Sequence, residues 1–257
     1  MPSLTLPPET EVVLLLGSDA RPDETVGRND TIMIGVVDRQ SGGVTLISVP
    51  RDLYVYVPGW RVDRVNTAEI RGGLGMLYDT IEYNFGMRPT HVARGNFTGF
   101  MQAVDLLGGV DVQVAGYMSD ECGGVYRTYA PGTYHMNGFE ALCYVRVRKA
   151  SSDFDRLRRQ QEVLIALFQR VVSLDGLTRL PALYAQFSPL VETDLSLNDL
   201  LGLLPVATSV ASDPGRLRRY AIDNSMATGW RVPVSGASVL LPNRDAIEAM
   251  LETALSS

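Results

Sequence analysis

The chain has 257 residues, of which 46% are hydrophobic and 20% charged, and its formal net charge at pH 7 is −6. This composition is typical of a globular protein with ample apolar material for a core, and the acidic balance argues against nucleic acid as the main partner. No apolar run reaches the roughly 18 to 20 residues that span a bilayer, and no signal peptide pattern is present. We therefore expect either a cytoplasmic protein or a domain whose anchor lies outside this sequence, with residues 1–10 as a proline-rich linker.

The first half of the chain alternates strand-like and helical patterns. Strand-like runs are short, apolar, rich in β-branched residues and bounded by turn formers, and they cover 11–16, 31–37, 44–49, 91–94 and 110–114. Asp38–Gly43 joins the second run to the third and predicts a hairpin. Helical spacing of apolar residues covers 72–85 and 97–107. Three Gly-Gly pairs, at 72–73, 108–109 and 123–124, are interpreted as turns.

The second half begins with a basic segment, YVRVRKASSDFDRLRRQQ, at residues 144–161. Alternating valine and arginine from Tyr144 to Arg148 predicts a half-buried strand, and apolar spacing over 154–172 predicts a helix. Helix, strand and helix are expected at 196–211, 217–222 and 243–254. Strands that alternate with helices predict an α/β fold: a central mixed β-sheet flanked by helices on both faces, in three layers, as one domain over 11–257.

The basic segment also predicts an anion site. Ser152 and Asp155 suggest a capping box, which places a helix start beside the end of the predicted strand. Four polar side chains would then converge where free helix N–H groups point, namely Arg146, Arg148, Arg156 and Gln160. The alternative is a solvated charged face, and this stretch alone does not decide between the two.

Carboxylates and arginines also stand at the ends of predicted strands. Asp19 follows the first strand, Arg28 and Asp30 precede the second, and Arg51 follows the third in VPRD. Ligands bind at strand ends in α/β sheets, and two carboxylates with phosphate oxygens can hold Mg²⁺. Each aspartate taken alone is more typical of a turn or a helix cap than of a metal site.

The sequence motifs of several well-known catalytic and nucleotide-binding sites are absent. There is no GxxxxGK[ST] loop, GxSxG elbow or HExxH motif, and the two histidines, His91 and His135, are not placed for a serine triad. Cys122 and Cys143 form no CxxC motif, which argues against zinc. Composition leaves open whether they are free buried thiols or a disulfide.

The motifs taken together resemble the LytR-CpsA-Psr family of bacterial cell-envelope enzymes. The resemblance runs in order over residues 12–172 through LLLGSD, GRNDT, ISVPRD, RVNTAEIRGG, LLGGVDVQV, GTYHMNGFEALCYVRVR and SDFDRLRRQQ. It implies an extracytoplasmic α/β domain, tethered by an N-terminal transmembrane segment outside this sequence, with the residues after 172 as an extension packed on the motif-bearing part. Such a domain binds a polyprenyl phosphate or pyrophosphate lipid and, with Mg²⁺, transfers a glycopolymer phosphate to peptidoglycan.

Carried onto this chain, the resemblance assigns Asp19 and Asp30 to the metal. It assigns the lipid pyrophosphate to Arg28, Arg51, Arg146, Arg148, Arg156 and Gln160, and it counts Arg51, Asp153 and Arg156 as catalytic. The general base is expected among Asp19, Asp30 and Asp153. The chain departs from the family at Asp155, where a glycine is usual, and at Leu53–Val55, where some members have a further arginine.

The resemblance leaves three functions open. The first is the glycopolymer phosphotransferase, the second is a polyprenyl pyrophosphate hydrolase that uses the same site with water, and the third is a non-catalytic lipid-binding module. Metal carboxylates together with arginines argue against the third. Tyr54, Tyr56, Trp60 and Arg61 are candidates for an acceptor groove. The extracytoplasmic setting that the resemblance implies also predicts a Cys122–Cys143 disulfide.

Overall fold

The computed structural model of the chain describes residues 4–18, 28–147 and 153–256. The described residues fall into two compact units. The first unit comprises the residues up to 94 together with those from 193 onward, and the second comprises residues 95–192. The unit boundaries fall within β6 (His91–Asn96) and within β11 (Val191–Thr193), so the chain leaves and re-enters the first unit through strands.

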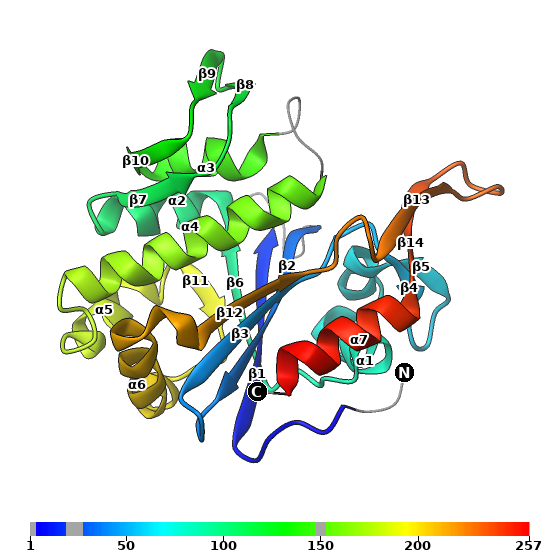
Figure 1. Ribbon diagram of the computed structural model, residues 1–257, viewed down its shortest axis with the longest axis horizontal. Coiled ribbons are helices and arrows are strands. Elements are labelled where there is room, and N and C mark those ends of the chain that lie inside the picture. The colour runs from blue at the N-terminus through cyan, green and yellow to red at the C-terminus, as the bar shows by residue number, and fades with distance from the viewer. Residues whose placement is uncertain (1–3, 19–27, 148–152, 257) are drawn as a thin grey trace. The chain divides into compact units, whose positions relative to one another are not determined.

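The largest sheet among the described residues is mixed and has six strands, in the order β11-β6-β1-β2-β3-β12 (Figure 1). Besides β6 and β11 it contains β1 (Thr10–Ser18), β2 (Asn29–Asp38), β3 (Gly43–Ser48) and β12 (Leu217–Ala221). β1, β2 and β3 pair in antiparallel fashion, whereas β12 runs parallel to β3. The predicted hairpin at Asp38–Gly43 and the mixed sheet are therefore confirmed.

Helices of the first unit cover both faces of this sheet. In register, Leu14, Ile34 and Ile47 lie side by side and share a core with α1 (Ala68–Phe85) and α7 (Arg244–Leu255). Alternation along the strands turns Val13 and Leu46 to the opposite face, and α6 (Leu197–Ser212) contacts β3. The predicted layers of helices on both faces are confirmed, and so are the predicted elements of the C-terminal part.

The remaining elements of the first unit are short. They are β4 (Tyr54–Tyr56), β5 (Val62–Arg64), the 3₁₀ turns η1 (Val65–Thr67) and η2 (Pro214–Arg216), β13 (Ala227–Arg231) and β14 (Ser238–Pro242). Helix α1 begins four residues before the predicted start and is interrupted at Gly72–Gly73. Gly73 has a φ of 72°, a backbone conformation that favours glycine. The helix is therefore kinked at this Gly-Gly pair, in agreement with its interpretation as a turn.

The second unit packs helices around small two-stranded sheets. Its strands are β7 (Val110–Val114), β8 (Met118–Cys122), β9 (Val125–Tyr129) and β10 (Gly132–Met136), which pair as β10-β7 and as the hairpin β8-β9. Its helices are α2 (Phe97–Leu106), α3 (Gly138–Arg146), α4 (Asp153–Ser173) and α5 (Leu180–Phe187). The hydrophobic core joins Val112 and Val114 to Tyr144 of α3 and Val163 of α4.

One predicted strand is wrong: Tyr144–Arg146 lie in α3, not in a β-strand. Asn137 and Glu140 form a complete capping box that begins the helix, and Ala141, Leu142 and Tyr144 bury one of its faces. The valine–arginine alternation spans too few residues to override that start signal. The basic segment therefore connects two helices, and Arg146 occupies the last turn of the first one.

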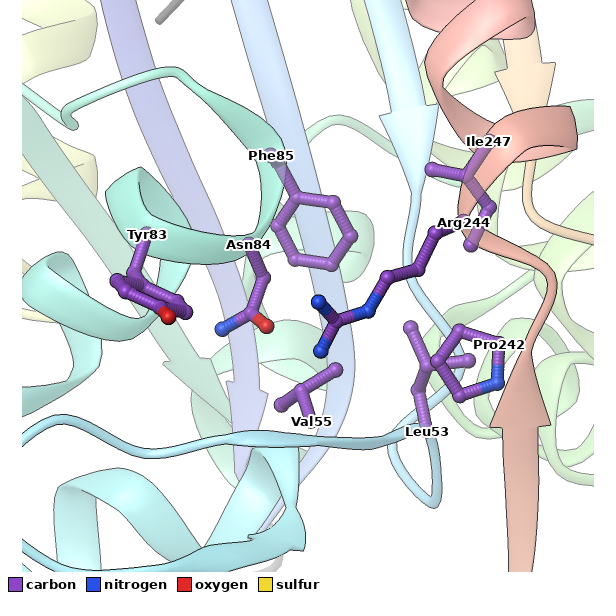
Figure 2. A pocket seen from close by; sticks show the side chains of 8 residues that line it. All are labelled: Leu53, Val55, Tyr83, Asn84, Phe85, Pro242, Arg244 and Ile247. Carbon is purple, nitrogen blue, oxygen red and sulfur yellow. The ribbon is translucent and has the colours of Figure 1, made fainter. Parts of the chain in front are cut away.

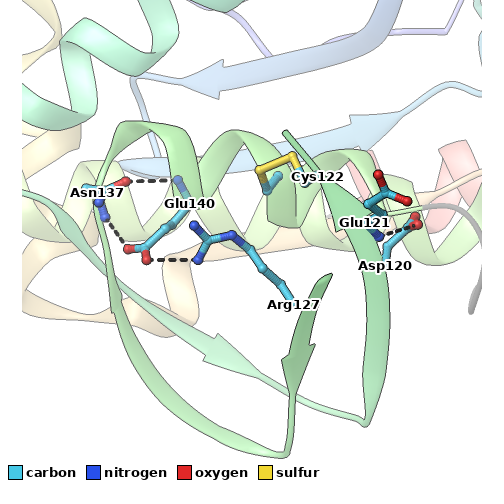
Figure 3. Close-up of a disulfide and its surroundings, with 7 residues drawn as sticks. Asp120, Glu121, Cys122, Arg127, Asn137 and Glu140 are labelled. Carbon is cyan, nitrogen blue, oxygen red and sulfur yellow. Dashed lines mark hydrogen bonds and ion pairs between the residues drawn. A yellow bond between two sulfur atoms is a disulfide. The ribbon is translucent and has the colours of Figure 1, made fainter. Parts of the chain in front are cut away.

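The Cys122–Cys143 disulfide is present and fastens hairpin β8-β9 to α3 (Figure 3). Its two cysteines are 21 residues apart, so the bond restricts a loop of considerable size in the unfolded chain. A cross-link of that span stabilises a protein by about 3 kcal/mol in the chain-entropy model.

We expect the variant with both Cys122→Ser and Cys143→Ser to lose about 3 kcal/mol of unfolding free energy, measured by urea titration. Reductant should lower the midpoint of the wild-type protein toward that of the variant. Reductant should not change the variant, which is the control. Equal midpoints for the wild-type protein and the variant, both without reductant, would contradict the prediction.

No helix in the described part of the chain is long and apolar enough to cross a membrane.

Candidate functional site

In the first unit, the start of β2 and the end of β3 bring together Asp30 and Arg51. The strands are antiparallel, with Met33 opposite Ser48, so the residues before Met33 and those after Ser48 share one end of the sheet. The Arg51 guanidinium donates to the Asp30 carboxylate, and both side chains are largely withdrawn from solvent. Two residues predicted to belong to one site are thus in direct contact. Arg28 lies just before β2 with its side chain exposed.

A second arginine reaches the VPRD segment from β5. Asp52 accepts from Arg51 at 3.3 Å and from Arg64 at 3.4 Å, so its carboxylate lies between two guanidinium groups. Arg64 begins the RVNTAEIRGG motif but is not among the predicted site residues. The resemblance implies a further arginine near Leu53–Val55 in some members, and in this chain Arg64 supplies a positive charge to the same segment from a neighbouring strand.

A buried polar cluster supports the residue next to Asp30. The Asn29 side-chain amide donates to Glu69 at 2.7 Å, and the other oxygen of the Glu69 carboxylate accepts from Arg94. Asn29 is 1% exposed and Glu69 4%. A buried ion pair needs such additional hydrogen bonds to offset its desolvation. The cluster fixes the backbone from which Arg28 and Asp30 project.

In the second unit, Arg146 projects from the last turn of α3 and stacks on an aromatic ring. Its guanidinium carbon lies 4.6 Å from the centre of the Phe97 ring. The planar guanidinium of arginine suits this stacking and leaves its N–H edge for an anion. The side chain is exposed, as a residue that meets a ligand requires.

Arg156 and Gln160 lie one turn apart on α4, as predicted, and both are buried. Their exposed fractions are 5% and 9%. The side-chain oxygen of Gln160 is buried and has no hydrogen-bond partner among the described residues. Polar side chains buried to this degree are held there by the fold, so their positions are set before a ligand arrives.

Arg159, between them, has a different role from its neighbours. It is fully buried and donates to the carbonyl oxygen of Val147 at 2.7 Å, directly after the end of α3. Burial lowers the pKa of Arg159. Tyr144 of α3 donates to Glu162 of α4 at 2.7 Å, and burial followed by this carboxylate raises the pKa of the tyrosine. These two bonds join α3 to α4 and fix the helix end that carries Arg146.

Three predicted site residues lie outside the described part. Asp19 and Arg148 belong to segments that the structure does not describe, and the side chain of Asp153 is likewise outside it. Asp155, where the resemblance implies a glycine, has a carboxylate oxygen 3.8 Å from Arg158. Among the described residues there is no cluster of three His, Cys, Asp or Glu side chains that could hold a metal. Mg²⁺ commonly needs only one or two carboxylates besides phosphate and water, and Asp30 offers one.

The residues predicted to line an acceptor groove, Trp60 and Arg61 among them, belong to the first unit. Trp60 is 46% exposed, and the guanidinium groups of Arg61 and Arg71 lie 5.1 Å and 5.0 Å from its ring centre. A pocket next to β4, shown in Figure 2, is lined by Leu53, Val55, Asn84 and Arg244 among others. Its volume of about 10 Å³ holds roughly one water molecule, so it is too small for a prenyl chain.

Comparison with known sequences decides the family. The profile of the LytR_cpsA_psr family matches residues 4–254, which includes the C-terminal part where the motifs are weak. The chain belongs to the LytR-CpsA-Psr family. Solved structures agree: Bacillus subtilis TagV superimposes with a TM-score of 0.80 over 96% of this chain and 97% of TagV, and at 24% identity it shows the shared fold.

The relatives of this chain include proteins named for cell-wall functions. TagT of Bacillus subtilis, a polyisoprenyl-teichoic acid–peptidoglycan teichoic acid transferase, is 36% identical over 210 residues, which are 78% of this chain and 65% of TagT. LcpB of Corynebacterium glutamicum, a probable cell wall biosynthesis protein, is 38% identical over 62% of this chain and 42% of LcpB. The structure of TagT with bound octaprenyl pyrophosphate has a TM-score of 0.70 and 28% identity over 97% of this chain and 92% of that one. The chain thus spans less than two thirds of the length of these two curated relatives.

Proposed function

We propose that this chain transfers a glycopolymer phosphate from a polyprenyl pyrophosphate carrier to peptidoglycan. The observation that carries the proposal is the placement of Arg51, Arg146 and Arg156 on structured, supported positions in a chain 36% identical to a named teichoic acid transferase. That relative also has structures with octaprenyl pyrophosphate and with LI-WTA bound. The disulfide supports an oxidising location outside the cytoplasm, and an N-terminal anchor remains part of the proposal.

In the proposed reaction, the arginines stabilise negative charge on the phosphate groups. A hydroxyl oxygen of the acceptor attacks the phosphorus next to the glycan, the new O–P bond forms, and the bond to the polyprenyl phosphate breaks. Negative charge develops on that leaving group. A guanidinium about 4 Å from a phosphate contributes roughly 4 kcal/mol at an effective dielectric near 20, before desolvation is subtracted. Because the prenyl chain would leave the membrane for another apolar environment, selectivity would come mainly from these headgroup contacts.

Mg²⁺ is a further part of the proposal. Asp30 would be one ligand, and Asp19, outside the described residues, the second. When bound, the ion would neutralise pyrophosphate charge and so stabilise the leaving group. Because Asp30 already contacts Arg51, its carboxylate would link the metal to a phosphate-binding arginine. The general base remains a prediction among Asp19, Asp30 and Asp153.

We expect Asp30→Asn to weaken the Mg²⁺ dependence of turnover, because the amide keeps the shape of the side chain but loses the charge that attracts a cation. The half-saturating Mg²⁺ concentration should rise about 10-fold or more, measured with a lipid-linked donor at fixed ionic strength. Asp63→Asn, at a carboxylate that accepts from Arg61, is the control. An unchanged Mg²⁺ titration in Asp30→Asn would remove Asp30 from the metal site.

The proposed function is tested by following a radiolabelled glycan. Wild-type protein with a lipid-linked glycan donor and peptidoglycan fragments should place label on the peptidoglycan. A transferase must hold the acceptor near the phosphorus, since proximity contributes several kcal/mol against attack by water. If phosphate release is robust while no label reaches peptidoglycan, the hydrolase function replaces the transferase. If the donor binds without either reaction, the chain is a lipid-binding module.

A further inference from the structure

Large aromatic side chains gather on one surface of the first unit, around hairpin β4-β5. Tyr54 and Tyr56 are two residues apart on β4, hence on one face of the strand, and the residue between them is buried in the core. The Tyr56 ring centre lies 4.9 Å from that of Tyr83, and the Tyr54 ring centre lies 6.0 Å from that of Trp230. We call these four rings and Trp60, in the turn between β4 and β5, the aromatic face.

The aromatic face is exposed to solvent. Tyr56, Trp60, Tyr83 and Trp230 expose 36%, 46%, 49% and 38% of their surface. Hairpin β13-β14, which carries Trp230, projects from the same unit (Figure 1), and Val234 at its tip is 98% exposed. Large apolar side chains that are exposed next to one another indicate an interaction site, whereas single exposed ones are ordinary.

Arginines beside the rings indicate the charge of the partner. The Arg71 guanidinium lies 5.0 Å from the Trp60 ring centre, and Arg231 is the last residue of β13. Both are exposed, and neither makes an ion pair with another described residue. Arg61, also beside Trp60, is matched by Asp63 at 3.2 Å. The aromatic face therefore offers positive charge to an anionic partner, although the net charge of the chain is −6.

The exposed aromatic residues of the second unit have a different electrostatic setting. Tyr117 and Tyr126 are 79% and 68% exposed. Tyr126 lies opposite Glu121 in hairpin β8-β9, and Asp120 is the next residue of β8. An anionic partner would be repelled by these carboxylates, so Tyr126 is a suitable control for the aromatic face.

We propose that the aromatic face docks the first unit onto the surface of an anionic lipid bilayer. Tryptophan and tyrosine favour the membrane–water interface, because their apolar rings and polar groups suit its two sides. Each unpaired arginine adds attraction to anionic headgroups. The face adjoins the proposed phosphate site, since Tyr54 lies opposite Arg64, which donates to Asp52 of VPRD at 3.4 Å. Docking would thus bring that site to the membrane surface, and the docking itself does not depend on the proposed function.

The test measures binding of the whole chain, without donor, to sucrose-loaded vesicles of phosphatidylglycerol and phosphatidylcholine in equal parts. The chain should sediment with these vesicles, and less of it should do so as salt rises. Its tryptophan emission should shift to the blue on binding, because Trp60 and Trp230 are its two tryptophans. The double variant Arg71→Glu, Arg231→Glu should lower the partition coefficient about 10-fold or more.

A second double variant, Arg216→Glu with Arg219→Glu, is the matched control. It changes the net charge equally on the same unit, but Arg216 donates to Ser41, before the start of β3, whereas VPRD follows the end of that strand. Its partition coefficient, and that of Tyr126→Ser, should stay within about 2-fold of the wild-type value. Unchanged urea midpoints establish that the variants are folded.

Several outcomes would overturn the inference while leaving the proposed function in place. They are absence of binding to the vesicles, equal losses in the two double variants, and loss of binding in Tyr126→Ser. Dimers in sedimentation velocity that Trp60→Ser abolishes, without vesicle binding, would make the aromatic face an interface between copies. An emission shift with peptidoglycan fragments but not with vesicles would make it an acceptor groove.

A second arm connects docking to turnover. The double variant Arg71→Glu, Arg231→Glu should turn over lipid-linked donor at the wild-type rate in detergent, and about 10-fold more slowly when the donor is embedded in the vesicles. Equal rates in the vesicles would overturn a docking role. A wild-type chain that binds vesicles but turns over no donor in either medium would count against the proposed function alone.

Discussion

Arg51→Ala and Arg156→Ala are each expected to lower turnover of a polyprenyl pyrophosphate-linked donor by 10² to 10³, which corresponds to roughly 3 to 4 kcal/mol of transition-state stabilisation. Each guanidinium is held before the ligand arrives. Arg51 contacts Asp30 and Asp52, and Arg156 is buried on α4, with 5% of its surface exposed. Preorganised charges of this kind contribute most where charge develops during the reaction. The measurement is single-turnover release of polyprenyl phosphate at saturating donor.

Arg158→Ala is the matched control for Arg156→Ala. Arg158 lies on the same helix, is 42% exposed and pairs with Glu162 at 3.3 Å. Its replacement by alanine should therefore change turnover less than 2-fold. Circular dichroism and the urea midpoint establish that each variant is folded. Arg156→Lys adds a test of geometry, because lysine keeps the charge but lacks the planar fork. Folded Arg51→Ala and Arg156→Ala proteins with wild-type turnover would refute the assignment of the site.

Much of the fold follows from short-range patterns in the sequence. The apolar runs at 31–37 and 44–49 become β2 and β3, because each has the period and the bounding turns of a strand, and the helix predicted at 154–172 becomes α4 with one residue added at each end. In both cases local propensity and burial agree. At Tyr144–Arg146 they conflict, since a few alternating residues suggest a strand while the capping box at Asn137 begins a helix that buries Tyr144.

The sequence predicts candidate site residues by their type, but it does not predict the residues that support them. Asp30 and Arg51 stand at strand ends, and the sequence patterns suffice to place both there. Phe97 beneath Arg146, and Arg94 beside Glu69, are contacts between residues 49 and 25 positions apart, which no local periodicity encodes. A glutamate in the first turn of α1 and a lone arginine in the strand HVARGN were the available signals. Long-range pairing is therefore what the structure adds.

Breaking the buried Glu69–Arg94 pair is expected to destabilise the first unit strongly. Glu69 and Arg94 expose 4% and 11% of their side chains, so Glu69→Ala takes a carboxylate away from a guanidinium that water reaches poorly. Removal of one partner of a buried ion pair typically costs about 3 to 5 kcal/mol. The Asn29 amide also loses its acceptor. Urea unfolding of the variant should show this loss as a lower midpoint with an unchanged slope.

Glu82→Ala provides the control on the same helix. Glu82 pairs with Arg88, but the two side chains are 48% and 53% exposed, so the loss should stay below about 1 kcal/mol. The combined replacement of Glu69 and Arg94 by methionine should recover part of the stability that Glu69→Ala loses, because no buried charge then remains at these two positions. A loss below about 1 kcal/mol in Glu69→Ala, equal to that of Glu82→Ala, would show that the cluster does not hold Asn29 and hence does not position Asp30. A large loss that the double replacement relieves would identify the buried charge itself as the cause.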